Sequence, residues 1–187
     1  MKKILLLLTL LMCLGGMRAS GADNPKANPK AVVTRGNARF TVLTPEMIRI
    51  QYSSKGLFED RATFGVVNRN LPVPKFQTTE KDGWLEIKTS ALTLRYRLGD
   101  AIDAAQRSSK SLSVTLTVNG KPVLWYPGKD NALNLKGTTR TLDGNMGDDK
   151  RAELEDGVVS RAGWTVIDES PLAKRGDGST TFAFDKK

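Results

Sequence analysis

The sequence has no histidine among its 187 residues, and its single cysteine is Cys13. Without histidine, the protein cannot use a histidine general base, a Ser-His or Cys-His nucleophile pair, or the commonest metal-binding side chain. No apolar run reaches the roughly 20 residues that a membrane-spanning helix needs. Because 39% of the residues are hydrophobic and 26% are charged, the composition is that of a globular protein, and the length fits one domain.

The beginning of the chain has the pattern of a secretory signal peptide. Two lysines precede an apolar core over residues 4–14, and small residues follow. We therefore predict a signal peptide over residues 1–22, cleavage after Gly21 or Ala22, and export to the periplasm or the extracellular space. Cys13 lies inside the apolar core, which disfavours lipidation and leaves the mature chain to fold without disulfides.

The charge balance is basic, with 29 Lys+Arg against 20 Asp+Glu and a formal net charge of +9. Three of the basic residues belong to the predicted signal peptide, which holds no acidic residue. The remaining Lys and Arg are spread along the chain, without a basic stripe and without interleaved aromatic residues. This distribution is typical of a solvated surface, so we predict no nucleic-acid partner.

Alternation of apolar and polar residues predicts β-strands along much of the chain. Residues 111–118 alternate without a break, and residues 48–52 and 92–98 show the same period. Phe182 and Phe184 indicate a last strand. Each of these segments would bury one face and expose the other.

Two dipeptides predict tight hairpins between such strands. Asp82-Gly83 stands ahead of an apolar-rich segment over residues 84–87, and Asn119-Gly120 stands ahead of residues 121–126. Two-residue hairpin turns need positive φ at their central residues, which Asn, Asp and Gly adopt most readily. The strands are therefore expected to be largely antiparallel.

Helical periodicity is nearly absent, and residues 100–107 are the best candidate for a turn or two of helix. Residues 23–30 are polar and contain two prolines, so we expect a mobile leader before Ala31 begins the first strand. Many short strands separated by Gly, Pro and Asp predict an all-β antiparallel sandwich over residues 31–187, a single domain after the signal peptide.

Acidic and aromatic side chains are the candidates for chemistry. The acidic stretch lacks the ligand spacing and mid-loop glycine of the common calcium loop, and neighbours on one loop rarely keep the separation of a glycosidase carboxylate pair. We therefore predict no catalytic residue, no metal site and no cofactor. The tryptophans leave two interpretations open, a sugar-stacking platform or core positions in alternating strands. The acidic residues are Asp143, Asp148, Asp149, Glu153, Glu155 and Asp156, and the tryptophans are Trp84, Trp125 and Trp164.

Two segments in the second half carry specific motifs. Residues 134–144 end in Leu-Asp-Gly, and residues 154–170 contain Glu-Asp-Gly-Val-Val-Ser-Arg-Ala-Gly-Trp. With residues 44–52 and 64–69, they resemble the N-terminal domain of bacterial glycoside hydrolase family 31, the α-glucosidase and α-xylosidase family. The resemblance covers nearly the whole mature chain.

The resemblance implies a galactose-mutarotase-like β-sandwich that precedes a (β/α)8 barrel carrying both catalytic aspartates. Such a barrel needs about 250 residues. We therefore expect a non-catalytic module truncated before its barrel, with that family 31 barrel as its partner and an α-linked oligosaccharide as the implied ligand class. Mutarotase activity is not expected, because its acid/base pair normally includes histidine and function depends on the site rather than the fold.

The resemblance also implies a loop at the rim of the substrate pocket. On it, Asp156 and Arg161 would hydrogen-bond the sugar and Trp164 would give apolar support, although the family pattern has aspartate where this chain has Ala162. An ion pair between Asp156 and Arg161 that fixes the loop is the alternative. Two other functions stay open, a stand-alone carbohydrate-binding protein and a module that docks a separately encoded barrel. In the truncated module, residues 133–164 are expected to contribute to an exposed apolar surface.

Overall fold

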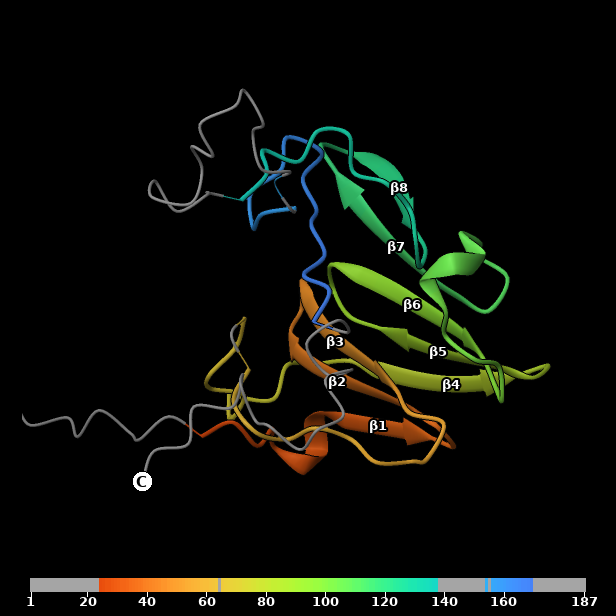
Figure 1. The fold of residues 1–187 in the computed structure, drawn as a ribbon. Helices are drawn as coiled ribbons and strands as arrows, with labels where there is room; N and C mark the ends of the chain where they lie inside the picture. The colour runs from red at the N-terminus through yellow and green to blue at the C-terminus, as the bar shows by residue number, and fades with distance from the viewer. Residues whose placement is uncertain (1–23, 64, 138–153, 155, 170–187) are drawn as a thin grey trace, which may run out of the picture.

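A computed structural model describes residues 24–63, 65–137, 154 and 156–169. It shows an all-β sandwich of two antiparallel sheets, with only two short 3-10 turns as helix in this part of the chain (Figure 1). The three-stranded sheet has the order β1-β2-β3, and the five-stranded sheet has the order β4-β5-β6-β7-β8. The strands are β1 Val32–Arg35, β2 Ala38–Thr44, β3 Met47–Tyr52, β4 Gln77–Lys81, β5 Trp84–Lys88, β6 Leu92–Arg97, β7 Leu112–Val118 and β8 Lys121–Trp125.

The predicted hairpin turns are confirmed. Asp82 and Gly83 have φ values of 52° and 79°, and Asn119 and Gly120 have 51° and 76°. Positive φ at both central residues matches the right-handed twist of the flanking strands. These turns fix the register of β4 on β5, with Lys81 opposite Trp84, and of β7 on β8.

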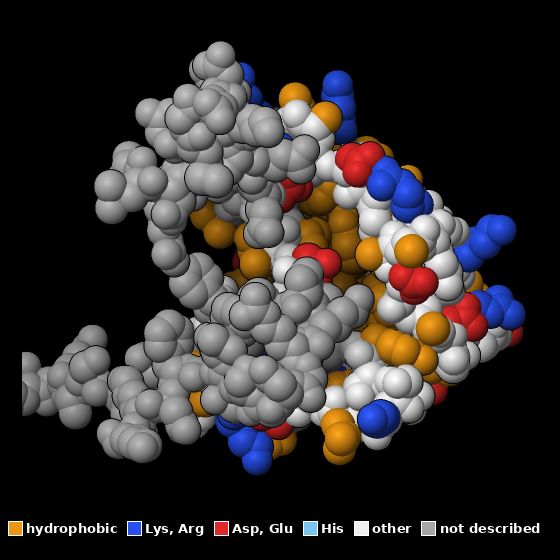
Figure 2. All heavy atoms as spheres, viewed as in Figure 1, with side chains coloured by type: hydrophobic (Ala, Val, Ile, Leu, Met, Phe, Trp, Pro, Cys, Tyr) orange, Lys and Arg blue, Asp and Glu red, His pale blue; other side chains and the backbone are white. Residues whose placement is uncertain are grey.

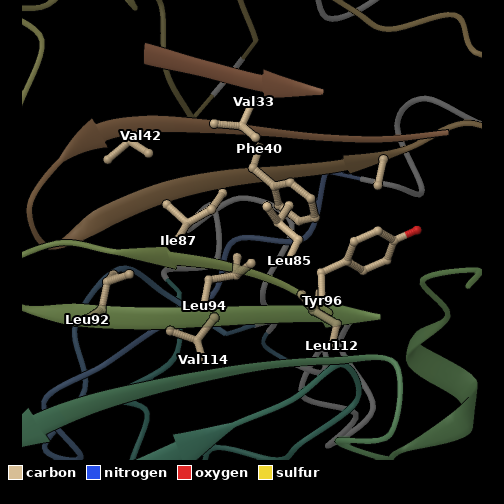
Figure 3. Packing of buried hydrophobic residues seen from close by; sticks show 11 residues of the cluster. Val33, Phe40, Val42, Leu85, Ile87, Leu92, Leu94, Tyr96, Leu112 and Val114 are labelled. Carbon is tan, nitrogen blue, oxygen red and sulfur yellow. The ribbon is translucent and has the colours of Figure 1, made fainter. Parts of the chain in front are cut away.

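The core lies between the two sheets, where Phe40 of β2 meets Tyr96 of β6 with ring centroids 5.2 Å apart (Figure 3). Both residues are at most 1% exposed. The Tyr96 hydroxyl donates to the Asp100 carbonyl at 2.6 Å, and burial raises the pKa of Tyr96. The buried cluster consists of Val33, Ala38, Phe40, Val42, Leu85, Ile87, Leu92, Leu94, Tyr96, Leu112 and Val114.

Two polar contacts join the sheets at their margins. Arg35, at the end of β1, forms an ion pair with Glu80 of β4 at 2.5 Å. The Thr89 hydroxyl, in the β5–β6 turn, donates to the Pro45 carbonyl in the β2–β3 turn at 2.6 Å. These polar contacts hold the margins of the two sheets together, and the alternation of apolar and polar residues does not predict them.

The two segments outside the strands differ in part from expectation. The helix candidate over residues 100–107 is one 3-10 turn, Ala104–Gln106, because Asp103 caps it and Arg107 turns left-handed with φ 45°. Ala31 closes a second turn, Pro29–Ala31, so the first strand begins one residue later than predicted. In the segment predicted as a mobile leader, the Asn24 carbonyl accepts from the Arg69 backbone N–H at 2.8 Å.

The predicted last strand at Phe182 and Phe184 and the predicted signal peptide over residues 1–22 lie outside the described residues. Nothing in the described part of the chain is a helix long and apolar enough to cross a bilayer.

Candidate functional site

The segment after β8 pairs with a segment more than twenty residues further along the chain. Asn134 and Ser160 form an isolated antiparallel bridge. On either side of it, the Leu135 N–H donates to the Val159 carbonyl and the Arg161 N–H donates to the Leu133 carbonyl, both at 3.0 Å. We call residues 131–137 and 156–165 together the clamp.

Asn134 holds the clamp through its side chain. It is 7% exposed. Its Nδ2 donates to the Gly157 carbonyl at 3.0 Å and to Thr165 Oγ1 at 3.1 Å, and its Oδ1 accepts from the backbone N–H groups of Lys136 at 2.7 Å and Gly157 at 2.9 Å. A buried carboxamide with all four bonds satisfied specifies one arrangement of the two segments, because any other would leave polar atoms unpaired.

Asn131 fixes the other end of the clamp. Its Nδ2 donates to the Trp164 carbonyl at 2.7 Å, and its Oδ1 accepts from Ser160 Oγ at 3.0 Å. Ser160 Oγ in turn accepts from the Ala162 N–H at 3.0 Å. The Asn131 and Ser160 side chains therefore shape the turn that carries Arg161 and Ala162.

Close backbone approach explains two glycines of the clamp. A Cβ atom at Gly157 would lie 2.4 Å from the Lys136 carbonyl oxygen, and one at Gly163 would lie 2.5 Å from Val118 Cγ1. Gly163 also has φ 75°, which a side chain disfavours. The Gly residues of the Glu-Asp-Gly and Ala-Gly-Trp pieces thus bring this segment against its neighbours.

The three predicted rim residues all lie on the clamp, but they make different contacts. Asp156 is exposed and pairs with Lys136, Nζ to Oδ1 at 2.5 Å. Arg161 is exposed, and no ion pair between it and Asp156 occurs among the described residues, so the alternative pairing is wrong. Trp164 is half-buried.

Exposed apolar side chains gather on and beside the clamp. Seven of the twelve exposed large hydrophobic residues in the described part of the chain belong here, and Val158 is 74% exposed. The segment over residues 156–169 crosses the face seen in Figure 1, and hydrophobic side chains reach the surface in the middle of that face in Figure 2. We call the seven exposed residues on and beside the clamp the apolar patch. They are Leu133, Leu135, Leu154, Val158, Val159, Val166 and Ile167.

The remaining candidates from the sequence are the other two tryptophans and the acidic residues. Trp125 packs against the core from β8, whereas Trp84 lies on the outer face of the five-stranded sheet, so the tryptophans form no common platform. Within the described ranges, no group of three or more His, Cys, Asp or Glu side chains could hold a metal ion. Five of the six acidic residues singled out from the sequence, all except Asp156, lie outside those ranges.

An arginine cluster behind the three-stranded sheet escaped the sequence pattern. The Glu59 carbonyl accepts from Arg39 at 3.1 Å, from Arg49 at 2.8 Å and from Gln51 at 3.2 Å. Burial, followed by the nearby Arg69 charge, lowers the pKa of Arg49 to about 10. The alternation over residues 48–52 predicted Arg49 and Gln51 as outward-facing, but only their contacts with the Glu59 carbonyl explain why both are half-buried.

Glu59 provides a test of this loop. Its hydrogen bonds from Arg61, down to 2.5 Å, lower the pKa of Glu59 from 4.5 to about 2. A lowered carboxyl pKa stabilises the fold above pH 4.5, and this contribution is lost as the pH falls toward 2. Arg61→Gln is expected to return the pKa of Glu59 toward 4.5, as measured by carboxyl NMR titration. As a control, Arg107→Gln, which removes the ion-pair partner of Asp130, should leave the pKa of Glu59 unchanged. A pKa of Glu59 near 4.5 in the unmodified chain would contradict the hydrogen bonds from Arg61.

Comparison with known proteins gives no assignment, since the chain matches no protein-family model and no curated protein. Information on function therefore comes from the geometry of the clamp and from the exposed residues of the apolar patch.

Proposed function

We propose that the chain is the non-catalytic N-terminal module of a family 31 α-glycosidase, exported through the signal peptide over residues 1–22, and that it docks on the catalytic barrel of that enzyme. In this proposal the fold is galactose-mutarotase-like and the barrel lies outside these 187 residues. The all-β sandwich and the motif residues of the clamp support it.

The apolar patch is the observation that carries the proposal. It coincides with the segment of closest family resemblance, and its seven large apolar side chains are exposed, Val158 to 74%. Exposed apolar side chains grouped in one region are typical of interaction surfaces. Contacts between domains commonly cover about 600–1,500 Å². Burial of ~300 Å² of apolar surface, at ~25 cal/mol per Å², would contribute about 7 kcal/mol of gross favourable free energy. A barrel surface is a partner of sufficient size for such a contact.

The clamp would serve the docked enzyme as a rim. Asn134 and Asn131 hold its backbone rigidly, while Asp156 and Arg161 keep exposed polar ends. Ala162, in place of the aspartate of the family pattern, offers no side-chain acceptor to a sugar hydroxyl. This copy of the rim would therefore bind its sugar through fewer hydrogen bonds.

The purified chain is expected to hydrolyse neither aryl α-glucosides nor aryl α-xylosides, because both catalytic carboxylates of the family lie on the barrel. The measurement is chromophore release over hours at high protein concentration. Asp156→Asn serves as the diagnostic variant and Asp130→Asn, at another exposed carboxylate, as its control. Turnover that Asp156→Asn abolishes would place a catalytic carboxylate on this domain and overturn the proposal.

A stand-alone carbohydrate-binding function is the second candidate. One observation favours it, a hollow on the outer face of the five-stranded sheet that combines Trp84 with cationic side chains.

A further inference from the structure

The outer face of the five-stranded sheet is hollowed beside β5, β6 and β7. The hollow has a volume of about 600 Å³, within the range of small-ligand sites, and is open to solvent. It shares no residue with the clamp or the apolar patch. The lining residues that matter here are Trp84, Arg95, Arg97, Asp100, Lys110 and Leu124.

Strand register explains why two arginines flank one tryptophan. Trp84 of β5 pairs with Arg97 of β6, and Arg95 lies two residues away on the same face. The guanidinium carbons of Arg95 and Arg97 lie 4.9 Å and 5.8 Å from the Trp84 ring centroid. The ring holds both groups by cation–π attraction, so their donors are ordered before any ligand arrives.

The charged side chains that line the hollow are mainly positive. Arg95, Arg97 and Lys110 face a single lining carboxylate, Asp100, whose Oδ2 already accepts from Ser111 Oγ at 2.8 Å. Arg95 forms an ion pair with Glu86 of β5, whose closest atoms are 3.9 Å apart, beyond hydrogen-bond distance. The hollow therefore offers the fork-shaped donors of Arg97 and the loosely paired donors of Arg95, together with the Asp100 carboxylate as an acceptor.

We propose that this hollow binds an acidic oligosaccharide through the carboxylate of a hexuronate residue. The planar guanidinium groups of Arg95 and Arg97 suit a carboxylate, which accepts two parallel hydrogen bonds from such a fork. Asp100 accepts from a sugar hydroxyl, and the Leu124 side chain packs against the apolar face of the ring. The proposal is independent of barrel docking.

The same features disfavour other anions. Inorganic phosphate would use the cations but neither Asp100 nor Leu124. Single-stranded nucleic acid needs a series of free aromatic faces, whereas the hollow has one tryptophan, already stacked on two arginines. A sugar acid matches the mixture of cations, acceptor and apolar surface.

The test is calorimetric titration of the purified chain with trigalacturonate and with its methyl-esterified form, which keeps the sugar rings and removes the charges. Trigalacturonate is expected to bind the unmodified chain. The methyl ester should bind the unmodified chain at least about tenfold more weakly, and trigalacturonate should bind the Arg97→Gln variant at least about tenfold more weakly. High salt should weaken the binding, since the charges are solvent-exposed. Lys88→Gln, which removes an exposed charge outside the lining of the hollow, should bind as the unmodified chain does.

Equal binding of the acid and its ester would overturn the proposal, as would equal losses in Arg97→Gln and Lys88→Gln. Competition by inorganic phosphate at the concentration of trigalacturonate would show a general anion site and overturn the sugar assignment. Tighter binding of oligothymidylate than of trigalacturonate would also overturn it. No binding of any of these ligands to a chain with native circular dichroism would contradict the site altogether.

Discussion

Phe40→Ala is expected to lower the free energy of unfolding by about 4 kcal/mol, within the usual range for truncating a buried phenylalanine. Phe40 is fully buried, and its ring packs on Tyr96 of the other sheet. The substitution removes apolar burial from both sheets and leaves a cavity between them. Because a domain of this size has a net stability of about 5–15 kcal/mol, much of the margin would be lost.

Chemical denaturation monitored by tryptophan fluorescence and by circular dichroism measures this effect. Phe58→Ala is the matched control, since Phe58 lies partly exposed beneath Arg39 and should cost about 1 kcal/mol or less. Phe40→Leu should fall between the two. If the two alanine variants lost the same stability, or if the two probes gave separate transitions, the sheets would not share the core described above.

The second large effect is expected at the clamp. Gly157→Ala places a Cβ 2.4 Å from the Lys136 carbonyl oxygen, and Asn134→Ala removes a side chain that makes four hydrogen bonds. Each substitution should destabilise the clamp by about 2–4 kcal/mol, because buried groups lose their partners or must move apart. The strands of the sandwich should remain folded, since the clamp lies outside both sheets.

Hydrogen exchange of the Leu135 and Arg161 amides reports this opening, because both donate across the clamp. Their protection should fall by about 30- to 1,000-fold, at about 1.4 kcal/mol per tenfold change, while the amides of β6 keep theirs. Asn70→Ala, at an exposed asparagine, is the control. Unchanged protection in both clamp variants would show that the Asn134 network does not hold these segments together.

Local patterns predicted much of the fold. β3, β6 and β7 follow from period-two alternation, and the two hairpin turns follow from their dipeptides. β4 gave little signal of its own, because all five of its residues are exposed at the edge of the sheet and none belongs to an apolar alternation. The pairing of sheets across Phe40 and Tyr96 joins residues distant in sequence, which periodicity cannot specify.

The candidate site was less accessible to sequence reasoning. Asn131 and Asn134 are typical loop residues, and only the fold shows that both carboxamides are buried and hydrogen-bonded, with all four bonds made at Asn134. Asp156 was predicted as a rim residue, but its partner Lys136 comes from a segment twenty positions away. The Arg95 and Arg97 side chains belong to an ordinary alternating strand, and their position over the Trp84 ring becomes visible only from the pairing of β5 with β6.

The proposed docking of this module is tested most directly by mixing the purified chain with a separately expressed family 31 catalytic barrel and measuring association by analytical ultracentrifugation. Docking through the apolar patch predicts a one-to-one complex that Val158→Asp weakens strongly, because Val158 is the most exposed member of the patch. Leu57→Asp is the matched control, since Leu57 has nearly the same exposure, 76% against 74%, but lies outside the patch, and it should leave the complex intact. Failure of the unmodified chain to associate, or equal weakening by both substitutions, would contradict docking through this surface.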